Sequence, residues 1–370
     1  MTISAQYGLI DQKEYFNKIV ASKSLANYYL LKKGDFAYNK SYSTGYPYGT
    51  IKRLNKYDKG AVSTLYICFK PRNIDSNFLE QYFETDKWYK KIYKIAVEGA
   101  RNHGLLNIAI SDFFNTKHYI PKSKDEQIKI SKFLEIVDEK IDLLEKKKEI
   151  KLKIKEYYIQ QIFLEDWDNK IKFYDYKPLN EITFYQEGPG VRNYQYTNKG
   201  VKLLNVGNFV KNKLILENTD RYISKEEAYG KYKHFLVDEG DLLIACSGIK
   251  AEYFNEKIAF AEKKDLPLCM NTSTMRFKSL DDNYLNLNYL KWYFQTPLFK
   301  KEIFRILTGS AQFNFGPTHL KYLKILIPPL DYQIKIGNFM DLIKENIDYI
   351  DIKIKLMKQF KKGLLQKMFV

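Results

Sequence analysis

Apolar residues near the end of the chain recur at alternating steps of four and three over residues 333–369. They fill nine of ten successive places, with Lys361 in the tenth: Ile336, Met340, Ile343, Ile347, Ile350, Ile354, Met357, Leu364 and Met368. A mean spacing of about 3.5 residues keeps one stripe of a helix, here called the seam, against a partner helix, which predicts a coiled coil. Pro328 and Pro329 stand before the pattern and can end the preceding segment. Such a helix extends over about 55 Å and needs a partner of similar length.

The same pattern occurs earlier in the chain, where residues 127–130 match 333–336 at an offset of 206 residues (333 − 127). Between 127 and 142, eight of sixteen residues equal their counterparts without a gap. The seam of this first copy reads Ile130, Leu134, Val137, Ile141 and Leu144, then Lys148, Lys151 and Lys155, then Tyr158 and Ile162. Because its middle is weak, we expect Ile150, Leu152 and Ile154 to rotate toward the partner. The alternative is a pair of solvated, charged helices, which the nine apolar places of the second copy disfavour.

Each long helix follows a stretch in which strand and helix patterns are mixed. Residues 36–39 and 61–69 read as strands, the second ending at Pro71, and 77–97 predict one or two helices. The predicted fold class is therefore α+β, with two repeated mixed α/β domains separated by two long antiparallel helices that form a coiled coil. The expected boundaries are 1–119 and 166–326 for the domains, and 120–165 and 327–370 for the long helices.

The two globular stretches repeat each other less closely than the helices do. Gly240 and Asp241 match Gly34 and Asp35 at the same offset of 206 residues (240 − 34), whereas residues 288–290 match 77–79 at an offset of 211 (288 − 77). Residues 309–311 correspond to residues 99–101 in the loop that follows the predicted helices of each domain. The two helices are similar in sequence, whereas the two domains differ. This contrast predicts a common frame that carries two different binding domains.

The balance of charges points to a polyanionic partner. The chain has 61 Lys and Arg against 44 Asp and Glu, a formal net charge of +17. The alternative explanation of the positive charge is a general bias of the composition toward lysine. The 31 tyrosines and 24 phenylalanines offer rings that could stack on bases, although most such residues belong to cores.

Several classes of protein are disfavoured by what the sequence lacks. The three cysteines, Cys68, Cys246 and Cys269, include no C-x-x-C pair, which is typical of a reducing compartment and predicts a cytoplasmic protein. We expect no membrane span, no metal site and no cofactor, since neither a Gly-rich nucleotide loop nor an Asn-Pro-Pro-aromatic tetrapeptide occurs. The chain is predicted to be non-catalytic.

The segments around the long helices resemble those of a known family. The residues that carry the resemblance lie ahead of and at the end of the helices: Ile327, Pro328, Pro329, Leu330 and Gln333, Ile120, Pro121, Glu126 and Gln127, residues 361–366, and the turns at Gly34 with Asp35 and Gly309 with Ser310. In this order, and duplicated, they resemble the specificity subunit of type I restriction–modification systems. That resemblance implies two target recognition domains, each reading half of a split, asymmetric site in double-stranded DNA. It also implies that the paired helices dock two methyltransferase subunits, which restriction (translocase-nuclease) subunits then join.

Candidate DNA contacts are loop residues that carry hydrogen-bond donors or flat faces. In the first domain they are Asn39, Lys40, Ser41, Arg101 and Asn102, and in the second Arg192, Tyr194, Ser247, Lys250, Gln312, Phe313 and Asn314. For each of them the alternative is a turn residue that contacts no base.

The first domain departs from the family pattern at its start. Residue 1 corresponds to residue 207, so 167–206, with Trp167, the Gly188-Pro189-Gly190 turn and Arg192, has no counterpart. We therefore expect a shortened first domain that reads its half-site poorly or not at all. Two rival interpretations remain: a coiled-coil protein-interaction adaptor with two globular heads, and a methyltransferase fused to its own recognition domain.

Overall fold

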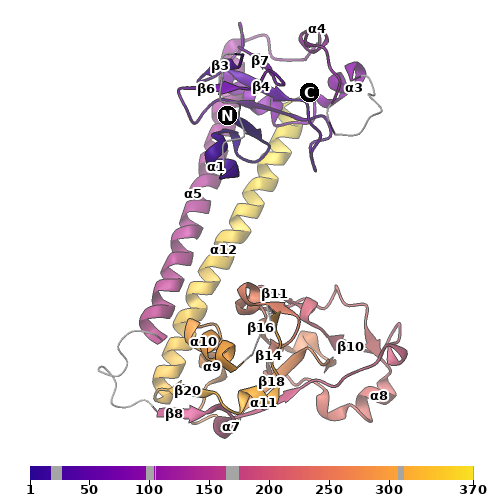
Figure 1. Cartoon of the computed structure of the whole chain (residues 1–370), viewed down its shortest axis with the longest axis vertical. Coiled ribbons are helices and arrows are strands. Elements are labelled where there is room, and N and C mark those ends of the chain that lie inside the picture. Colours follow the sequence, from indigo (N-terminus) through magenta and orange to yellow (C-terminus); the bar gives the residue numbers. More distant parts are fainter. Residues whose placement is uncertain (18–26, 97–103, 105, 164–174, 307–311, 370) are drawn as a thin grey trace. The chain divides into compact units, whose positions relative to one another are not determined.

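The computed structural model describes the chain apart from residues 18–26, 97–103, 105, 164–174, 307–311 and 370 (Figure 1). The chain forms two compact units. The first unit comprises Met1–Lys147 with Ile350–Val370, and the second comprises Lys148–Tyr349. Each unit therefore contains one mixed α/β domain together with part of both long helices.

The domain of the first unit is built on a three-stranded antiparallel sheet of order β5-β4-β7. Its strands are β4 (Phe36–Asn39), β5 (Thr50–Arg53) and β7 (Ile67–Phe69). Two further ladders pair β1 (Thr2–Ser4) with β2 (Gly8–Ile10) and β3 (Tyr29–Lys32) with β6 (Lys59–Val62). The short helices are α1 (Gln12–Phe16), α2 (Ser76–Phe83), α3 (Tyr89–Ile95) and α4 (Ile110–Phe114).

The core of the first unit is aromatic and includes both long helices. Buried Phe36, Tyr38 and Trp88 lie between the sheet and the short helices. The ring of Phe369, near the end of the chain, lies 5.2 Å from that of Phe78 and 5.8 Å from that of Tyr82, both on α2. Burial of such rings stabilises by a few kcal/mol each, so the end of the second long helix is anchored here.

The second unit has a four-stranded antiparallel sheet of order β16-β14-β18-β9 and a three-stranded sheet of order β13-β10-β17. In the second sheet β10 runs parallel to β17 and antiparallel to β13. The strands of both sheets are β9 (Thr183–Glu187), β10 (Val201–Leu204), β13 (Tyr222–Ile223), β14 (Leu242–Ala245), β16 (Ile258–Phe260), β17 (Leu268–Met270) and β18 (Thr274–Ser279). Short ladders join β11 (Phe209–Val210) to β12 (Lys213–Leu214), β15 (Ile249–Lys250) to β19 (Gln312–Phe313), and β8 (Asp175–Pro178) to β20 (Lys324–Ile327).

Helices pack beside both sheets of the second unit and complete their cores. They are α7 (Leu179–Ile182), α8 (Lys225–Tyr229), α9 (Leu287–Tyr293), α10 (Pro297–Ile306) and α11 (Pro317–Leu320), with 3-10 turns η1 (Asn193–Gln195), η2 (Val206–Asn208), η3 (Lys233–Phe235), η4 (Ala251–Glu256) and η5 (Lys263–Asp265). The ring of Phe163, at the end of the first long helix, lies 5.8 Å from that of Tyr289 and 6.0 Å from that of Tyr293. Phe163 and Phe369 thus have matching roles in the two units.

The long helices are α5 (Lys124–Phe163) and α12 (Leu330–Met368) (Figure 1). They pair antiparallel in each unit. In the first unit Asp138 bonds Lys361 at 2.6 Å and Glu145 bonds Lys358 at 2.6 Å, so the partner number falls as the α5 number rises. In the second unit the rings of Tyr158 and Phe339 are 4.9 Å apart.

Most of the predicted seam residues are buried where the helices pair. Ile130 and Ile336 and Met357 are half-buried, and the others are buried: Leu134, Val137, Ile141, Leu144, Met340, Ile343, Ile347, Ile350 and Ile354. Leu144 packs with Ile350, Ile354 and Met357 in the first unit. Met340, Ile343 and Ile347 join the core of the second unit, which also holds Ile159 and Phe163.

Two details of the sequence analysis are wrong. Residues 61–69 do not form one strand, because residues 63–66 form a turn between β6 and β7. Ile150 and Leu152 do not rotate into the seam, and their side chains are 57% and 40% exposed. The stem of Lys155 keeps its seam place instead, with Nζ 5.0 Å from the centre of the Trp292 ring.

Residues 309 and 310 lie outside the described residues. Within those that are described, no helix is long and apolar enough to cross a membrane.

Candidate nucleic-acid interface

Loops gather at one end of the four-stranded sheet of the second unit. In this antiparallel sheet Ala245, the last residue of β14, pairs with Thr274, the first of β18, and Met275 pairs with Glu187, the last of β9. The segments that follow β9 and β14 and the turn that precedes β18 therefore leave the sheet at the same end. Function in α/β and β folds concentrates on loops that a rigid sheet positions in this way.

Several predicted DNA contacts meet at this end. The strand pairing of β15 with β19 places Ile249 opposite Phe313 and Lys250 opposite Gln312. Next to this ladder, Oδ1 of Asn314 lies 2.9 Å from the Ser247 hydroxyl and accepts a hydrogen bond of 2.8 Å from the Gly248 N–H. Residues that are 67 positions apart in sequence (314 − 247) thus form one surface.

The side chains of this surface keep donors for a ligand. Because Oδ1 of Asn314 is occupied, its amide NH₂ faces away from Ser247, and it has no protein partner within the described residues. Lys250 is exposed beside it. Gly248 has a φ of +73°, a conformation that favours glycine, so the turn that presents Ser247 depends on this residue.

A second glycine fixes the neighbouring loop. A Cβ on Gly188 would lie 2.3 Å from the Asn271 carbonyl oxygen, and the Gly188 N–H donates to the Thr274 carbonyl at 2.9 Å. The loop after β9 can therefore lie directly on the turn before β18 only because residue 188 lacks a side chain. Burial raises the pKa of Glu187, at the end of β9, which favours its neutral form at this surface.

Arg192 and Tyr194 lie further along this loop and are both exposed, Tyr194 by 86%. The Arg192 N–H donates to Oε1 of Gln195 at 3.0 Å, which fixes the backbone of η1 and leaves the guanidinium outside. In the described part of the chain, no hydrogen bond or ring contact joins either residue to Ser247 or Asn314.

The first unit has a corresponding surface. Asn39 is the last residue of β4, and its Oδ1 accepts from the Ser41 N–H at 3.1 Å. The Lys40 carbonyl accepts from the Leu106 N–H at 2.9 Å, just as the Cys246 carbonyl accepts from the Phe315 N–H at 2.9 Å. Lys40 and Cys246 are 206 residues apart (246 − 40), so the repeat extends to this loop. Arg101 and Asn102 lie outside the described residues.

Polar residues of the second unit that were not predicted from the sequence adjoin this surface. A groove of about 380 Å³ is lined by residues 205–208 and 218–221 together with Ser273. Oδ1 of Asn205 accepts from Nδ2 of Asn271 at 3.0 Å, which joins the groove to the turn before β18. A signal was available, since the polar residues Asn271, Thr272 and Ser273 lie between two largely buried strands.

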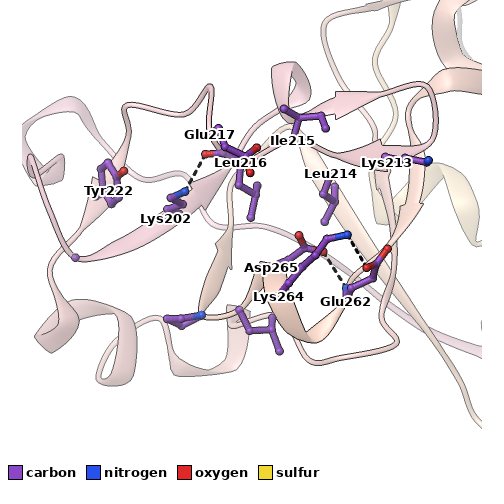
Figure 2. Close-up of a pocket in the computed structure, with 13 residues that line it drawn as sticks. Lys202, Lys213, Leu214, Ile215, Leu216, Glu217, Tyr222, Glu262, Lys264 and Asp265 are labelled. Atoms are coloured by element: carbon purple, nitrogen blue, oxygen red, sulfur yellow. Dashed lines mark hydrogen bonds and ion pairs between the residues drawn. The ribbon is translucent and has the colours of Figure 1, made fainter. Parts of the chain in front are cut away.

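A larger hollow of about 480 Å³ lies beside Gly200 and Lys202, away from the Asn205 end of β10 (Figure 2). Lys202 donates to the Leu216 carbonyl at 2.9 Å, and Lys264 bonds Glu262 at 2.6 Å. Since these ammonium groups already have partners, the hollow is a weaker candidate for a polyanion than the loops at the sheet end.

The comparisons with known proteins agree on one family. The model of the type I restriction modification DNA specificity domain matches residues 174–359, just over half of the chain. The type I restriction enzyme MjaVIII specificity subunit of Methanocaldococcus jannaschii is 23% identical over 327 residues, which cover 82% of this chain and 72% of that subunit.

Two solved structures have a similar fold. One comes from work on complex assembly and conformational transition of the type I R-M system, with a TM-score of 0.60 at 15% identity over 91% of this chain and 82% of that one. The other is the type I restriction-modification S subunit from M. genitalium, with a TM-score of 0.56 at 16% identity over 92% and 83% of the two chains. They confirm the predicted fold class. The family match confirms the resemblance as well, and this chain belongs to the type I restriction–modification DNA specificity family.

Proposed function

We propose that the chain is a non-catalytic DNA-specificity subunit that reads a bipartite site and docks methyltransferase and restriction subunits. The observation that carries this proposal is the duplicated loop surface, with Lys40 and Cys246 bonded alike at the ends of β4 and β14. Two such surfaces, one in each unit, suit a site with two separate halves. The proposed recognition domains are residues 1–119 and 166–326, and the proposed spacer helices are 120–165 and 327–370.

The surface of the second unit suits duplex DNA. Lys250 and Arg192 can neutralise phosphates, and the Asn314 amide, which has no partner among the described residues, can donate to a base acceptor in a groove. The net charge of +17 supports attraction to a polyanion. In the first unit Asn39, Lys40 and Ser41 occupy the matching place, so this domain also has part of a reading surface.

The long helices offer a surface for partner subunits. On α5, four apolar side chains at intervals of seven residues are more than half exposed: Ile136, Leu143, Ile150 and Tyr157. On α12 the apolar side chains that are at least half exposed are Tyr332, Leu342, Tyr349, Ile352, Leu356 and Phe360. A spacing of seven keeps the α5 side chains on one face, and such a stripe is typical of contact with a further helix. This supports docking of the methyltransferase subunits along the helices.

The test is co-expression of the chain with an adenine methyltransferase subunit, followed by mapping of methylated sites in the host genome. The expected result is a split motif that depends on the chain. A motif with one defined half would assign reading to one domain only. No new methylation despite a stable complex would contradict the proposal.

A second candidate function is a protein-interaction adaptor with two globular heads, which the exposed apolar stripes alone would favour. Salt dependence separates the two. A DNA reader loses affinity for duplex DNA steeply between about 50 and 200 mM salt, because counterions are released on binding. An adaptor would show no such DNA binding.

A further inference from the structure

The turn that joins β17 to β18 is rigid and lies at the loop end of the second unit. The Thr274 hydroxyl donates to the Asn271 carbonyl at 2.7 Å, and the Thr274 N–H donates to the same oxygen at 2.9 Å. The Thr272 N–H donates to Oδ1 of Asn271 at 2.9 Å. The Cys246 N–H in turn donates to the Ser273 carbonyl at 2.9 Å, which ties the turn to the loop that carries Ser247.

Two hydroxyls at the tip of this turn remain available. Thr272 is exposed and Ser273 is half-exposed. Neither hydroxyl bonds to another protein group within the described residues, whereas Thr274 and Asn271 use their side chains to build the turn. A rigid backbone that presents unpaired hydroxyls loses little entropy when those hydroxyls bind a ligand.

A positively charged side chain, that of Arg221, lines the groove beside Ser273. Arg221 is exposed and holds its guanidinium carbon 5.4 Å from the centre of the Tyr196 ring. Asp220 lines the same groove, so its charge is mixed and not uniformly positive. Stacking on a ring orders the guanidinium without using its N–H donors, which leaves them free for an anion.

We propose that Thr272 and Ser273 read base edges of the second half-site while Arg221, across the groove, binds a backbone phosphate. This inference rests on the proposed DNA-specificity function and adds residues that determine and position that recognition. Serine and threonine hydroxyls both donate and accept, so they suit base edges in a groove, and arginine suits phosphate oxygens. The turn and Ser247 then contact adjacent parts of one duplex.

The experiment uses the full chain in complex with its methyltransferase subunit and selects bound duplexes from a randomised DNA library. The variant Thr272→Val with Ser273→Ala keeps the shape of the turn and removes both hydroxyls. We expect the preference at one or two positions of one half-site to fall about fivefold per lost contact, with the other half-site unchanged. Arg221→Ala should weaken binding to all sequences evenly and lower the salt slope by about one.

Thr64→Val is the matched control, because Thr64 is an exposed threonine of the first unit. It should leave the second half-site unchanged. An unchanged motif in the double variant, together with an unchanged salt slope in Arg221→Ala, would overturn the inference and leave the proposed function standing. If the double variant does not fold, the salt slope of Arg221→Ala decides alone. A wild-type complex without salt-dependent DNA binding would overturn both.

Discussion

In the first unit the buried amide of Gln127, at the start of α5, accepts from the Asp75 N–H at 2.9 Å and donates to the Pro121 carbonyl at 2.8 Å. In the second unit Gln333, at the start of α12, accepts from the Asn286 N–H and donates to the Pro328 carbonyl, both at 2.8 Å. Asp75 and Asn286 are themselves the N-caps of α2 and α9. Most of the attachment of helix to domain is thus duplicated, although the Gln333 amide also donates to the Tyr284 carbonyl at 2.9 Å.

The two units differ in the sheets that flank these attachments. The second unit carries the β13-β10-β17 sheet with its own small core, which includes Val201, Leu203 and Ile223. The first unit has the β1 and β2 hairpin and the β3 and β6 ladder instead. The attachment is shared by both units and cannot account for a difference in what they bind. We expect such a difference to come from the flanking sheets.

The units also differ in an ion pair between the two long helices. Asp138 bonds Lys361 at 2.6 Å in the first unit. Their counterparts at an offset of 206 residues (344 − 138 and 361 − 155) are Lys344 and Lys155, two like charges. Lys344 bonds Asp348 at 2.5 Å, and Lys155 rests against Trp292. The duplicated helices therefore keep their shape while one ion pair is lost.

The largest expected effect comes from charging the seam in both units at once. Ile347 belongs to the second unit and Ile350 to the first, and both are buried. Replacing both by Asp buries unpaired carboxylates, which should cost several kcal/mol each and separate the helices. Loss of helical signal and of co-purifying methyltransferase subunit would be measured. Ile352→Asp, at an exposed place on the same helix, is the control for folding.

An unaffected double-Asp complex would refute the pairing of the helices. If Ile352→Asp keeps the helical signal and yet fails to bind the methyltransferase subunit, the exposed stripe of α12 is the docking surface.

The next effect tests whether the two anchors are equivalent. Phe163→Ala and Phe369→Ala each remove a buried ring that packs on two tyrosine or phenylalanine rings of one domain. Each should cost about 3–5 kcal/mol and loosen its own unit. Hydrogen exchange resolved by peptide reads the two units separately, with α2 reporting on Phe369 and α9 on Phe163. Phe360→Ala, at a half-exposed place, should change little. Loosening of both units by either variant would contradict the separate anchoring.

The seam could be predicted from sequence because its period is local, and Leu134, Met340 and Ile350 follow it. Lys155 shows where prediction of the seam from its period fails. A lysine in a seam suggests that neighbouring apolar residues rotate inward, yet Trp292, far away in sequence, accepts its stem and its charge. Such a partner is fixed by tertiary packing and leaves no periodic signal.

The candidate interface could be predicted only in part. Ser247 and Asn314 stand out as polar loop residues, but their hydrogen bond depends on the pairing of β15 with β19 across 67 residues (314 − 247). Thr272 and Ser273 resemble any short turn in sequence. Their availability follows from the bonds that occupy Asn271 and Thr274, which only the folded chain reveals.

The smallest expected effect is a pH dependence of stability that only the second unit should show. Burial, followed by the nearby charge of Lys344, lowers the pKa of Lys155 to about 8, from its ordinary value of 10.5. Below pH 8 the folded state must hold this ammonium at a cost, and between pH 8 and 10.5 the unfolded chain binds the additional proton. Stability of the second unit should therefore rise with pH through this window, by about 1–3 kcal/mol in total.

Lys155→Met keeps the stem on Trp292 and removes the charge, so it should stabilise the second unit at pH 7 and abolish the rise above pH 8. Lys361→Met in the first unit should have the opposite sign and destabilise by about 0.5–1 kcal/mol, because it removes the ion pair with Asp138 and leaves that carboxylate only the Gln81 amide among the described residues. Peptide-resolved hydrogen exchange at pH 7 and urea unfolding at pH 7 and 10 measure both. Destabilisation of the second unit by Lys155→Met at pH 7 would show that the Lys155 ammonium is favourable there, and would contradict the expected difference between the two seams.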